Sequence, residues 1–330
     1  MAVLRLPRRS VLRVAGDKAH DFLQGLVTLD MKNILAGDQL GGAAFLSPKA
    51  KVLCDTIVQA KNGGDEIFVD CHNNLAASLL RLLRRHKLQR ELEIDDVSDD
   101  FNVFWRRTAV DGELATKHTG DGFLVDPRFA GMGSRAILPS GSIDAGEDNG
   151  EYHNHRLACL VPEGPEDFKP DDVFPLHGNM DLTKQVSFNK GCYVGQELTT
   201  RSMMRGAVRK RYIGVIAGED EHTEPKCLQG LAHDGLLPGE LLEKQPNDTL
   251  VVESDVEEEA GVMSRDGDKF TNLGKLTSVA GRVGLCLIRL PDRANKPEQF
   301  VSAFEKLPPL YAHGVRLWPW LPPYVPRGSS

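Results

Sequence analysis

Apolar and polar residues alternate in short runs through the N-terminal third of the chain, and a period of two predicts β-strands. An Asn62-Gly63-Gly64 turn follows one of these runs, so we expect the runs on either side of it, 52–60 and 66–70, to pair as a hairpin. The predicted strands cover residues 11–14, 43–46, 52–60, 66–70, 92–97 and 101–105.

Two helices are predicted between these strands, because apolar residues recur three and four positions apart. The apolar face of the first consists of Ala19, Phe22, Leu23, Leu26 and Val27. The second covers 75–83, and its exposed face carries Arg81, Arg84, Arg85 and Lys87. Strands and helices alternate without a glycine-rich phosphate loop, which favours small α+β units over a dinucleotide-binding fold.

The second half of the chain has a different character. A loop rich in Gly, Ser and Asp at 139–149 precedes a helix predicted at 152–159, and residues 165–190 show little periodicity. After Arg211 strands and turns prevail, which predicts a β-rich C-terminal domain. Its predicted strands are 212–217, 250–253, 276–280 and 283–289, and the acidic stretch 253–259 is expected to be a solvated loop.

The composition is that of a soluble globular protein. Of 330 residues, 41% are hydrophobic and 26% charged, and the length suggests two or three domains. Because no apolar run approaches the roughly 20 residues of a membrane-spanning helix, we expect no membrane insertion. The net charge of −7 disfavours a nucleic-acid partner, although a local basic patch can still bind a small anion.

Both ends of the chain carry sequences that are not typical of a folded domain. The start has four arginines and no acid before Asp17, as in mitochondrial presequences. The strand predicted at 11–14 nevertheless indicates that the folded domain begins almost at once, so we expect any presequence to be missing or trimmed. Residues 326–330 resemble a protease-cleavage remnant from an expression vector and are excluded from the fold prediction.

The six cysteines are scattered and form no CxxC pair, unlike a disulfide scaffold or a self-contained metal site, which favours a reducing compartment. Cys192 alone lies between two glycines and close to a lysine. A nearby cation stabilises the reactive thiolate, and glycines permit unusual backbone conformations or close approach. We therefore predict a loop that presents an accessible Cys192 and runs into a short helix. The motif consists of Lys190, Gly191, Cys192, Tyr193, Gly195, Gln196, Glu197 and, one helical turn later, Arg201.

A run of five cations without an intervening acid continues from the motif. In a chain of net charge −7 it is a local positive field, which can hold the carboxylates of a small ligand or an acidic partner surface. The alternative is a solvated strand face. The run consists of Arg201, Arg205, Arg209, Lys210 and Arg211.

Taken together, these residues resemble the YgfZ-type proteins, which are similar to the folate-binding aminomethyltransferase of glycine cleavage (GcvT). The stretch from Lys190 to Glu197, with Arg201, matches the cysteine-containing signature of that family position by position. Weaker resemblances lie at Phe22–Thr28, Asp126–Arg128, Val161–Gly164, Val208–Arg211 and Gly281–Leu285. Asp126–Arg128 and Val208–Arg211 are most similar to the mitochondrial branch of the family, which assists late iron–sulfur cluster assembly.

The resemblance implies an α+β fold of the GcvT/YgfZ type, a three-domain ring around a central channel. One α+β domain is expected to be discontinuous, at 1–49 and 150–205, and the second to cover 50–149. The C-terminal β-barrel is expected at 206–325. Tetrahydrofolate is the cofactor implied for the channel, with Asp55, Arg205, Arg209 and Arg211 as candidate folate or anion contacts.

In function, the resemblance implies an accessory factor of the mitochondrial matrix, a monomer when alone, that helps to mature [4Fe-4S] proteins. The implied partners are A-type iron–sulfur scaffold proteins. One thiolate cannot hold an iron–sulfur cluster, because a cluster needs about four ligands. We therefore expect Cys192 to offer a transient ligand or thiol to a cluster that is shared with the partner.

One departure from the transferases bears on catalysis. They carry an Asp-Asp pair in a strand, whereas this chain has Cys54-Asp55, so we expect aminomethyl transfer to be lost. Three alternatives stay open. The chain is a tetrahydrofolate-dependent one-carbon (aminomethyl) transferase with Asp55 as the surviving acid, a cysteine-nucleophile enzyme that needs a base such as His177, or a binding module in which Cys192 is structural.

Overall fold

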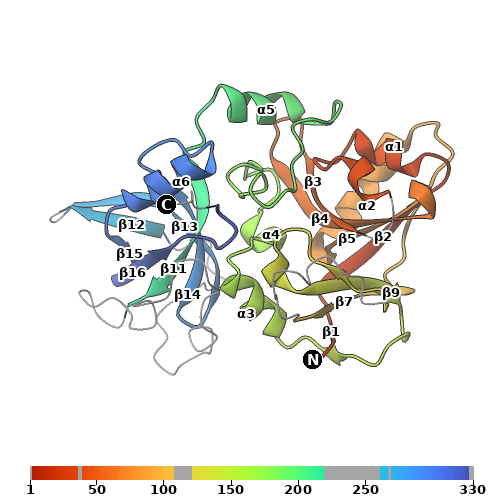
Figure 1. The fold of residues 1–330 in the computed structure, drawn as a ribbon, viewed down its shortest axis with the longest axis horizontal. Helices are drawn as coiled ribbons and strands as arrows, with labels where there is room; N and C mark the ends of the chain where they lie inside the picture. The colour runs from red at the N-terminus through yellow and green to blue at the C-terminus, as the bar shows by residue number, and fades with distance from the viewer. Residues whose placement is uncertain (1, 36–38, 108–120, 219–260, 267–268, 327–330) are drawn as a thin grey trace. The chain divides into compact units, whose positions relative to one another are not determined.

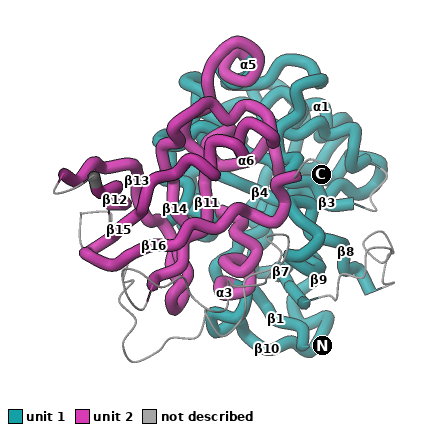
Figure 2. The backbone as a smooth tube through the Cα atoms, turned by 60° about the vertical axis from the view of Figure 1, so that its left-hand side comes forward, with its two compact units in different colours: residues 1–152, 163–175, 183–200 teal, residues 153–162, 176–182, 201–330 magenta. Residues whose placement is uncertain are grey.

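The structure, a computed structural model, divides into two compact units, drawn in teal and magenta in Figure 2. It describes residues 2–35, 39–107, 121–218, 261–266 and 269–326. Unit 1 consists of Met1–Tyr152, Glu163–Pro175 and Thr183–Thr200. Unit 2 consists of His153–Pro162, Leu176–Leu182 and Arg201–Ser330.

Unit 1 contains an antiparallel five-stranded sheet with the strand order β3-β4-β5-β2-β6. Its strands are β2 (Arg9–Ala15), β3 (Leu40–Leu46), β4 (Val52–Lys61), β5 (Glu66–His72) and β6 (Glu93–Asp96). β4 and β5 form the predicted hairpin, with Thr56 opposite Cys71. β4 is buried along most of its length, and this burial includes the polar side chains of Asp55 and Gln59.

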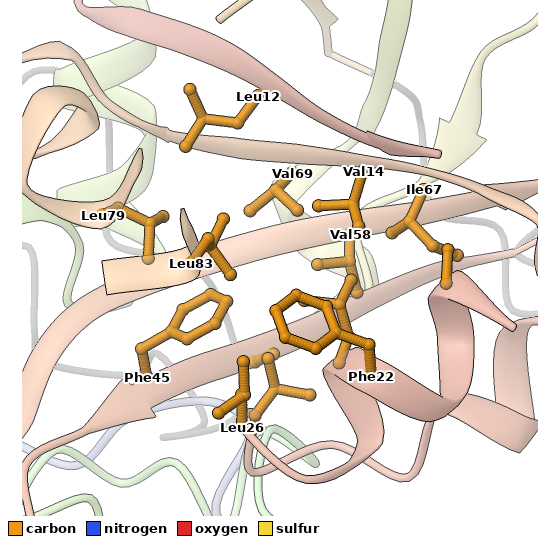
Figure 3. Packing of buried hydrophobic residues seen from close by; sticks show 14 of the residues in the cluster. Leu12, Val14, Phe22, Leu26, Phe45, Val58, Ile67, Val69, Leu79 and Leu83 are labelled. Carbon is orange, nitrogen blue, oxygen red and sulfur yellow. The ribbon is translucent and has the colours of Figure 1, made fainter. Parts of the chain in front are cut away.

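Helices α1 (Ala19–Gln24) and α2 (Asn73–Lys87) lie beside this sheet (Figure 1). Both supply apolar side chains to the core that packs on it. In α2, Ala76, Leu79 and Leu83 are buried at spacings of three and four residues, as expected for one apolar face. Its last turn is basic, which suits the negative end of the helix dipole. Figure 3 shows Leu79 and Leu83 in this core together with the rings of Phe22 and Phe45.

A second five-stranded sheet in unit 1 has the order β10-β1-β7-β9-β8. β1 runs parallel to β10, and the other neighbours are antiparallel. The strands are β1 (Leu4–Arg5), β7 (Phe101–Arg106), β8 (Leu124–Val125), β9 (Ser134–Pro139) and β10 (Gly146–Glu147). Among the described residues of the unit, the short helices are α4 (Gly164–Asp167), η1 (Met31–Ile34), η2 (Asn62–Gly64) and η4 (Ala130–Met132), the last three being 3₁₀ helices.

Unit 2 is built around a closed barrel with the strand order β11-β14-β13-β12-β15-β16. Its strands are β11 (Lys210–Ala217), β12 (Gly261–Asp266), β13 (Lys269–Ala280), β14 (Val283–Arg289), β15 (Leu310–Ala312) and β16 (Val315–Trp320). All described pairings in it are antiparallel. The barrel closes where β11 pairs with β16, with Gly214 opposite Trp320.

Three further helices accompany these elements (Figure 1). Helix α6 (Pro297–Glu305) belongs to unit 2 and begins with a proline, a residue suited to the first helical turn. Helices α3 (Glu151–Ala158) and α5 (Gln196–Met204) begin in residues of unit 1 and end in residues of unit 2. None of the helices in the described ranges is both long and apolar enough to span a membrane.

Most of the predicted elements are confirmed, and so is the α+β class with a C-terminal barrel. The elements that match a prediction are α1, α2, α3, α5, β2, β3, β4, β5, β6, β7, β11, β13 and β14. Helix α6 and the short strands β1, β8, β9, β10, β12, β15 and β16 are not predicted from the sequence. The predicted strand at 250–253, the acidic loop at 253–259 and Cys227 lie outside the described residues.

The division into three domains and the ring around a channel stay predictions. The expected boundary at residues 49 and 50 falls between β3 and β4, which pair with each other in one sheet. In addition, the chain passes between the two compact units several times between Tyr152 and Arg201. Strand pairing therefore joins β2 and β3 with β4, β5 and β6 in one sheet, across the boundary that was expected at residues 49 and 50.

Candidate functional site

Cys192 lies in the loop that leads into α5, and its side chain is exposed. The other four cysteines that the structure describes, Cys54, Cys71, Cys159 and Cys286, are buried. Within the described part of the chain, Cys192 is therefore the cysteine that a ligand or a partner protein can reach.

Lys190 anchors the start of this loop from inside unit 1. Its ammonium nitrogen donates hydrogen bonds to the carbonyl oxygens of Val27 and Leu29, at 2.7 and 2.6 Å. It also lies 4.9 Å from the centre of the Tyr193 ring, a favourable distance for a cation–π contact. Burial lowers the pKa of Lys190 to about 8, although Asp30 acts in the opposite direction. Only 8% of the residue is exposed, so this cation faces the interior.

Gly195 fixes the other end of the loop. Its φ of 83° lies in the left-handed region, which favours glycine. A Cβ atom at this position would lie 3.0 Å from both the Cα of Ala50 and the carbonyl oxygen of Ser47, and the backbone there has little room to move. Both observations show that the position requires glycine, because any other residue would displace the loop from β3 and the turn after it.

Gln196, Gly191 and Tyr193 also shape the loop that carries the thiol. The side-chain amide of Gln196 donates to the carbonyl oxygens of Lys190 and Gly191, both at 3.3 Å, and so ties the loop to the first turn of α5. Gly191 does not adopt a left-handed conformation, and the space that a Cβ atom would occupy there is open. Tyr193 is buried, and burial raises its pKa to about 12. A partner can therefore approach the backbone beside Cys192, while Gly191 is bonded to Gln196 and Tyr193 is buried on the other side.

This geometry corrects the role predicted for Lys190. The sequence suggests a cation beside the thiol, but the ammonium is buried and bonded to two carbonyl groups, so its role is to hold the loop. Glu197 and Arg201 are exposed on α5, four residues apart. The arrangement is an anchored loop that presents one accessible thiol, and in its thiolate form such a thiol can act as a metal ligand or as a nucleophile.

Replacing Lys190 by methionine is expected to lower the free energy of unfolding by about 1–3 kcal/mol, because two carbonyl groups lose their donor while the chain length is kept. Urea denaturation followed by circular dichroism measures the change. Lys169→Met, at an exposed lysine, is the matched control and should be close to neutral. An unchanged free energy of unfolding in Lys190→Met would show that the ammonium does not hold the loop.

Unit 1 also buries a cluster of charged side chains around Glu163. The carboxylate of Glu163 accepts hydrogen bonds from Arg128 and Tyr152 and forms an ion pair with Arg135. Arg128 in turn donates to both carboxylate oxygens of Asp126, at 2.9 and 2.7 Å. Because buried charges are tolerated only when they are paired and hydrogen-bonded, these side chains depend on one another.

Asp55, in β4, borders this cluster. It is 4% exposed, and one carboxylate oxygen accepts a hydrogen bond from the backbone nitrogen of Gly164 at 3.1 Å. Burial raises the pKa of Asp55 to about 6, and this holds although Arg9 and Arg128 oppose the shift while Glu163 adds to it. At neutral pH the carboxylate is therefore largely ionised in a site that disfavours its charge.

The Asp55→Asn variant is expected to be more stable than the parent protein by about 1–2 kcal/mol at pH 8, with no such gain at pH 4. The pKa of Asp55 is about 6 in the folded protein and roughly 3.9 in the unfolded chain, so ionisation costs stability as the pH rises from 4 through 6. The amide keeps an acceptor for Gly164 but carries no charge. Urea unfolding at both pH values tests this, with Asp144→Asn, at an exposed carboxylate, as control. Lower stability of Asp55→Asn at pH 8 would contradict the expectation.

The basic run that follows the motif divides into exposed and buried members. Arg205 and Arg209 are exposed, whereas Arg211, in β11, is fully buried. Its guanidinium contacts both carboxylate oxygens of Asp181, at 2.6 and 2.9 Å, and donates to two backbone carbonyl groups. This corrects the prediction of a surface contact at Arg211, because its charge is already neutralised inside unit 2.

Two of the four candidate folate contacts do not fit that role. The carboxylate of Asp55 is buried and bonded to Gly164, and the guanidinium of Arg211 is paired with Asp181. Arg205 and Arg209 keep exposed cations. Of the four candidates, these two therefore remain for an anionic ligand such as folate.

The buried cluster around Glu163 was not predicted from the sequence. Asp126 and Arg128 flank Pro127, and this local pairing of opposite charges is a sequence signal for an ion pair. Their partner Glu163 lies 35 residues beyond Arg128, and no periodicity connects the two. Both segments are noticed in the sequence only as points of family resemblance.

Several known proteins resemble this chain. The family model for the C-terminal beta-barrel domain of CAF17 matches residues 209–327, which include all six barrel strands. The human mitochondrial iron–sulfur cluster assembly factor IBA57 is 28% identical over 310 residues, which cover 87% of this chain and 77% of the human protein. The IBA57 homologue of Mycosarcoma maydis is 28% identical over 303 residues, with 87% and 73% covered. Mouse IBA57 is 31% identical over 239 residues, with 64% and 65% covered.

Among solved structures, the glycine cleavage system aminomethyltransferase T from Bartonella henselae has a similar fold. The two structures agree with a TM-score of 0.65 over 98% of this chain and 86% of that one. The sequence identity is 12%, so the likeness concerns the fold alone. It confirms an α+β fold of the aminomethyltransferase type with a C-terminal barrel.

Proposed function

We infer, from the kinship of this chain with the mitochondrial iron–sulfur cluster assembly factors named IBA57, that it acts in the same process in mitochondria. Relatives with this name match 87% of the chain, and the barrel model and the fold support the same kinship. Within this role, we propose that Cys192 offers its thiolate as a transient ligand to a shared cluster. The observation that carries the proposal is the exposure of Cys192 on an anchored loop.

The proposal follows from the number of ligands that a cluster needs. Iron–sulfur clusters are held by about four ligands, usually cysteine thiolates. Cys192 can supply one of them, and the other described cysteines are buried. The remaining ligands then come from a partner, and the open space beside Gly191 lets that partner approach the thiol. We propose A-type iron–sulfur scaffold proteins as these partners, in the mitochondrial matrix and late in the maturation of [4Fe-4S] proteins.

The Cys192→Ser variant is expected to form little or none of the cluster-bearing complex that the parent protein forms with an A-type scaffold protein. Anaerobic reconstitution, size-exclusion chromatography and visible absorbance of the complex measure this. Because Cys192 is exposed, thermal unfolding of the variant should match that of the parent within about 0.5 kcal/mol, which controls for misfolding. A serine variant that forms an equally coloured complex of the same spectrum would refute the ligand role.

One-carbon transfer from tetrahydrofolate is not favoured. The fold of the aminomethyltransferases is present, but Asp55, which stands where those enzymes have the second acid of their Asp-Asp pair, is buried and bonded within the protein. Turnover of methylene-tetrahydrofolate with an aminomethyl donor by the purified protein would restore this alternative.

A further inference from the structure

We propose that an apolar groove beside the Cys192 loop docks a segment of the partner protein that carries a large apolar side chain flanked by carboxylates. The groove lies in unit 1 and has a volume of about 480 Å³. Its apolar lining includes Leu26, Phe45, Leu46, Leu53, Leu82 and Val194. This inference rests on the proposed function, since it concerns how the partner that shares the cluster is held.

The groove opens onto the edge of the main core of unit 1. Leu26 and Phe45 line it, and both also belong to the core drawn in Figure 3. Leu82 and Val194 pack against that core while remaining partly exposed. Apolar surface that faces water gains roughly 25 cal/mol per Å² when it is covered, so a matching apolar side chain would bind here.

Basic side chains at the groove favour a partner segment that carries carboxylates beside its docked apolar side chain. Arg81, Arg85 and His86 line its rim, and all three are exposed on the C-terminal half of α2. The chain as a whole has a net charge of −7, so this rim is a local exception. Carboxylates beside the docked apolar group would meet the guanidinium groups of Arg81 and Arg85. This attraction would orient the segment and speed its association.

The position of the groove links it to the thiol. Val194 lines the groove and is two residues from Cys192, a separation of at most about 7 Å along the chain. Leu46, another lining residue, lies at the packing contact of Gly195, which holds the same loop in place. A protein segment seated in the groove would therefore bring its neighbouring residues to Cys192.

A protein segment fits this groove better than a small free ligand. Sites for small molecules usually place a few polar groups around the ligand to fix its orientation. Here the charged groups come from one stretch of α2 on one side, and the rest of the lining is apolar. Such one-sided polarity suits an amphipathic segment that is oriented by the rest of its own protein.

Calorimetric titration of the full chain with a cluster-free A-type scaffold protein tests the docking. The double variant Arg81→Glu/Arg85→Glu is expected to weaken binding at least about tenfold and to reduce its salt dependence. Leu53→Gln keeps the side-chain size at a half-buried position and is expected to weaken binding by about tenfold. Lys32→Glu makes the same kind of charge change at an exposed lysine outside the groove, and it should leave binding within twofold.

The outcomes separate this inference from the ligand role of Cys192. Cys192→Ser should bind the cluster-free scaffold like the parent protein and lose only the cluster-bearing complex. If both groove variants bind the scaffold like the parent, or if the parent does not bind it, the docking inference is overturned. A second outcome would also overturn it. If dodecanoate binds tightly to the parent but not to Leu53→Gln, and does not change scaffold binding, the occupant of the groove is a small amphiphile. If the groove variants bind the scaffold weakly, the docking inference is supported. If Cys192→Ser still forms the cluster-bearing complex, only the ligand role is refuted.

Discussion

Replacing Arg128 by methionine is expected to lower the free energy of unfolding by about 3–5 kcal/mol, because it removes the partner of two buried carboxylates. Asp126 would lose both of its hydrogen bonds to the guanidinium, and Glu163 would lose one charged donor. Burial alone would raise the pKa of Asp126, and it is Arg128 that lowers it. Chemical denaturation at neutral pH measures the loss, with Arg8→Met, at an exposed ion pair, as the near-neutral control.

The loss of stability in Arg128→Met is expected to depend on pH and on a second substitution. The lowered pKa of Asp126 contributes stability above roughly pH 4, the range of a free carboxyl group, and this contribution fades as the pH falls through the folded pKa. The gap between parent and Arg128→Met should therefore narrow under acid conditions. Adding Asp126→Asn should recover about 1–2 kcal/mol at neutral pH, since it removes the orphaned charge. A double variant no more stable than Arg128→Met would argue against a charge-based loss.

Arg211→Met is expected to cost a similar amount, about 3–5 kcal/mol, because Asp181 would be left buried without its cation. Two backbone carbonyl groups, of Leu176 and Ala294, would also lose their donor. Thermal and urea unfolding of unit 2 report this change. Arg209→Met is the matched control, since that arginine is exposed two residues earlier, and it should stay within about 0.5 kcal/mol. If the two variants were equally stable, Arg211 would be a surface cation after all.

Features set by neighbouring residues were predictable from the sequence. The leucines of α2 recur at helical spacing, and the same residues are buried in one face. The Asn62-Gly63-Gly64 turn predicts the pairing of β4 with β5. The helix after the cysteine motif is likewise local, because Gly195 and Gln196 end the loop where α5 begins.

Features set by distant residues were not predictable in this way. Lys190 turns inward because the carbonyl groups of Val27 and Leu29, more than 160 residues earlier in the chain, are presented to it. Arg211 is buried because Asp181 lies opposite it, and a run of cations gives no hint of that partner. The sequence shows that a lysine lies close to Cys192 along the chain. Whether its ammonium group points toward the thiol or into the protein depends on the tertiary structure.

The closure of the barrel has a consequence for how the chain is made. β11 begins at Lys210 and pairs with β16, which ends at Trp320, so about the last third of the chain must be synthesised before the barrel can close. At roughly 5–20 residues per second, synthesis of this stretch takes several seconds or more. During that time β11 has an open edge, and open edges invite pairing with other chains. Nascent or truncated chains that lack β16 should therefore depend on chaperones more than the complete chain does.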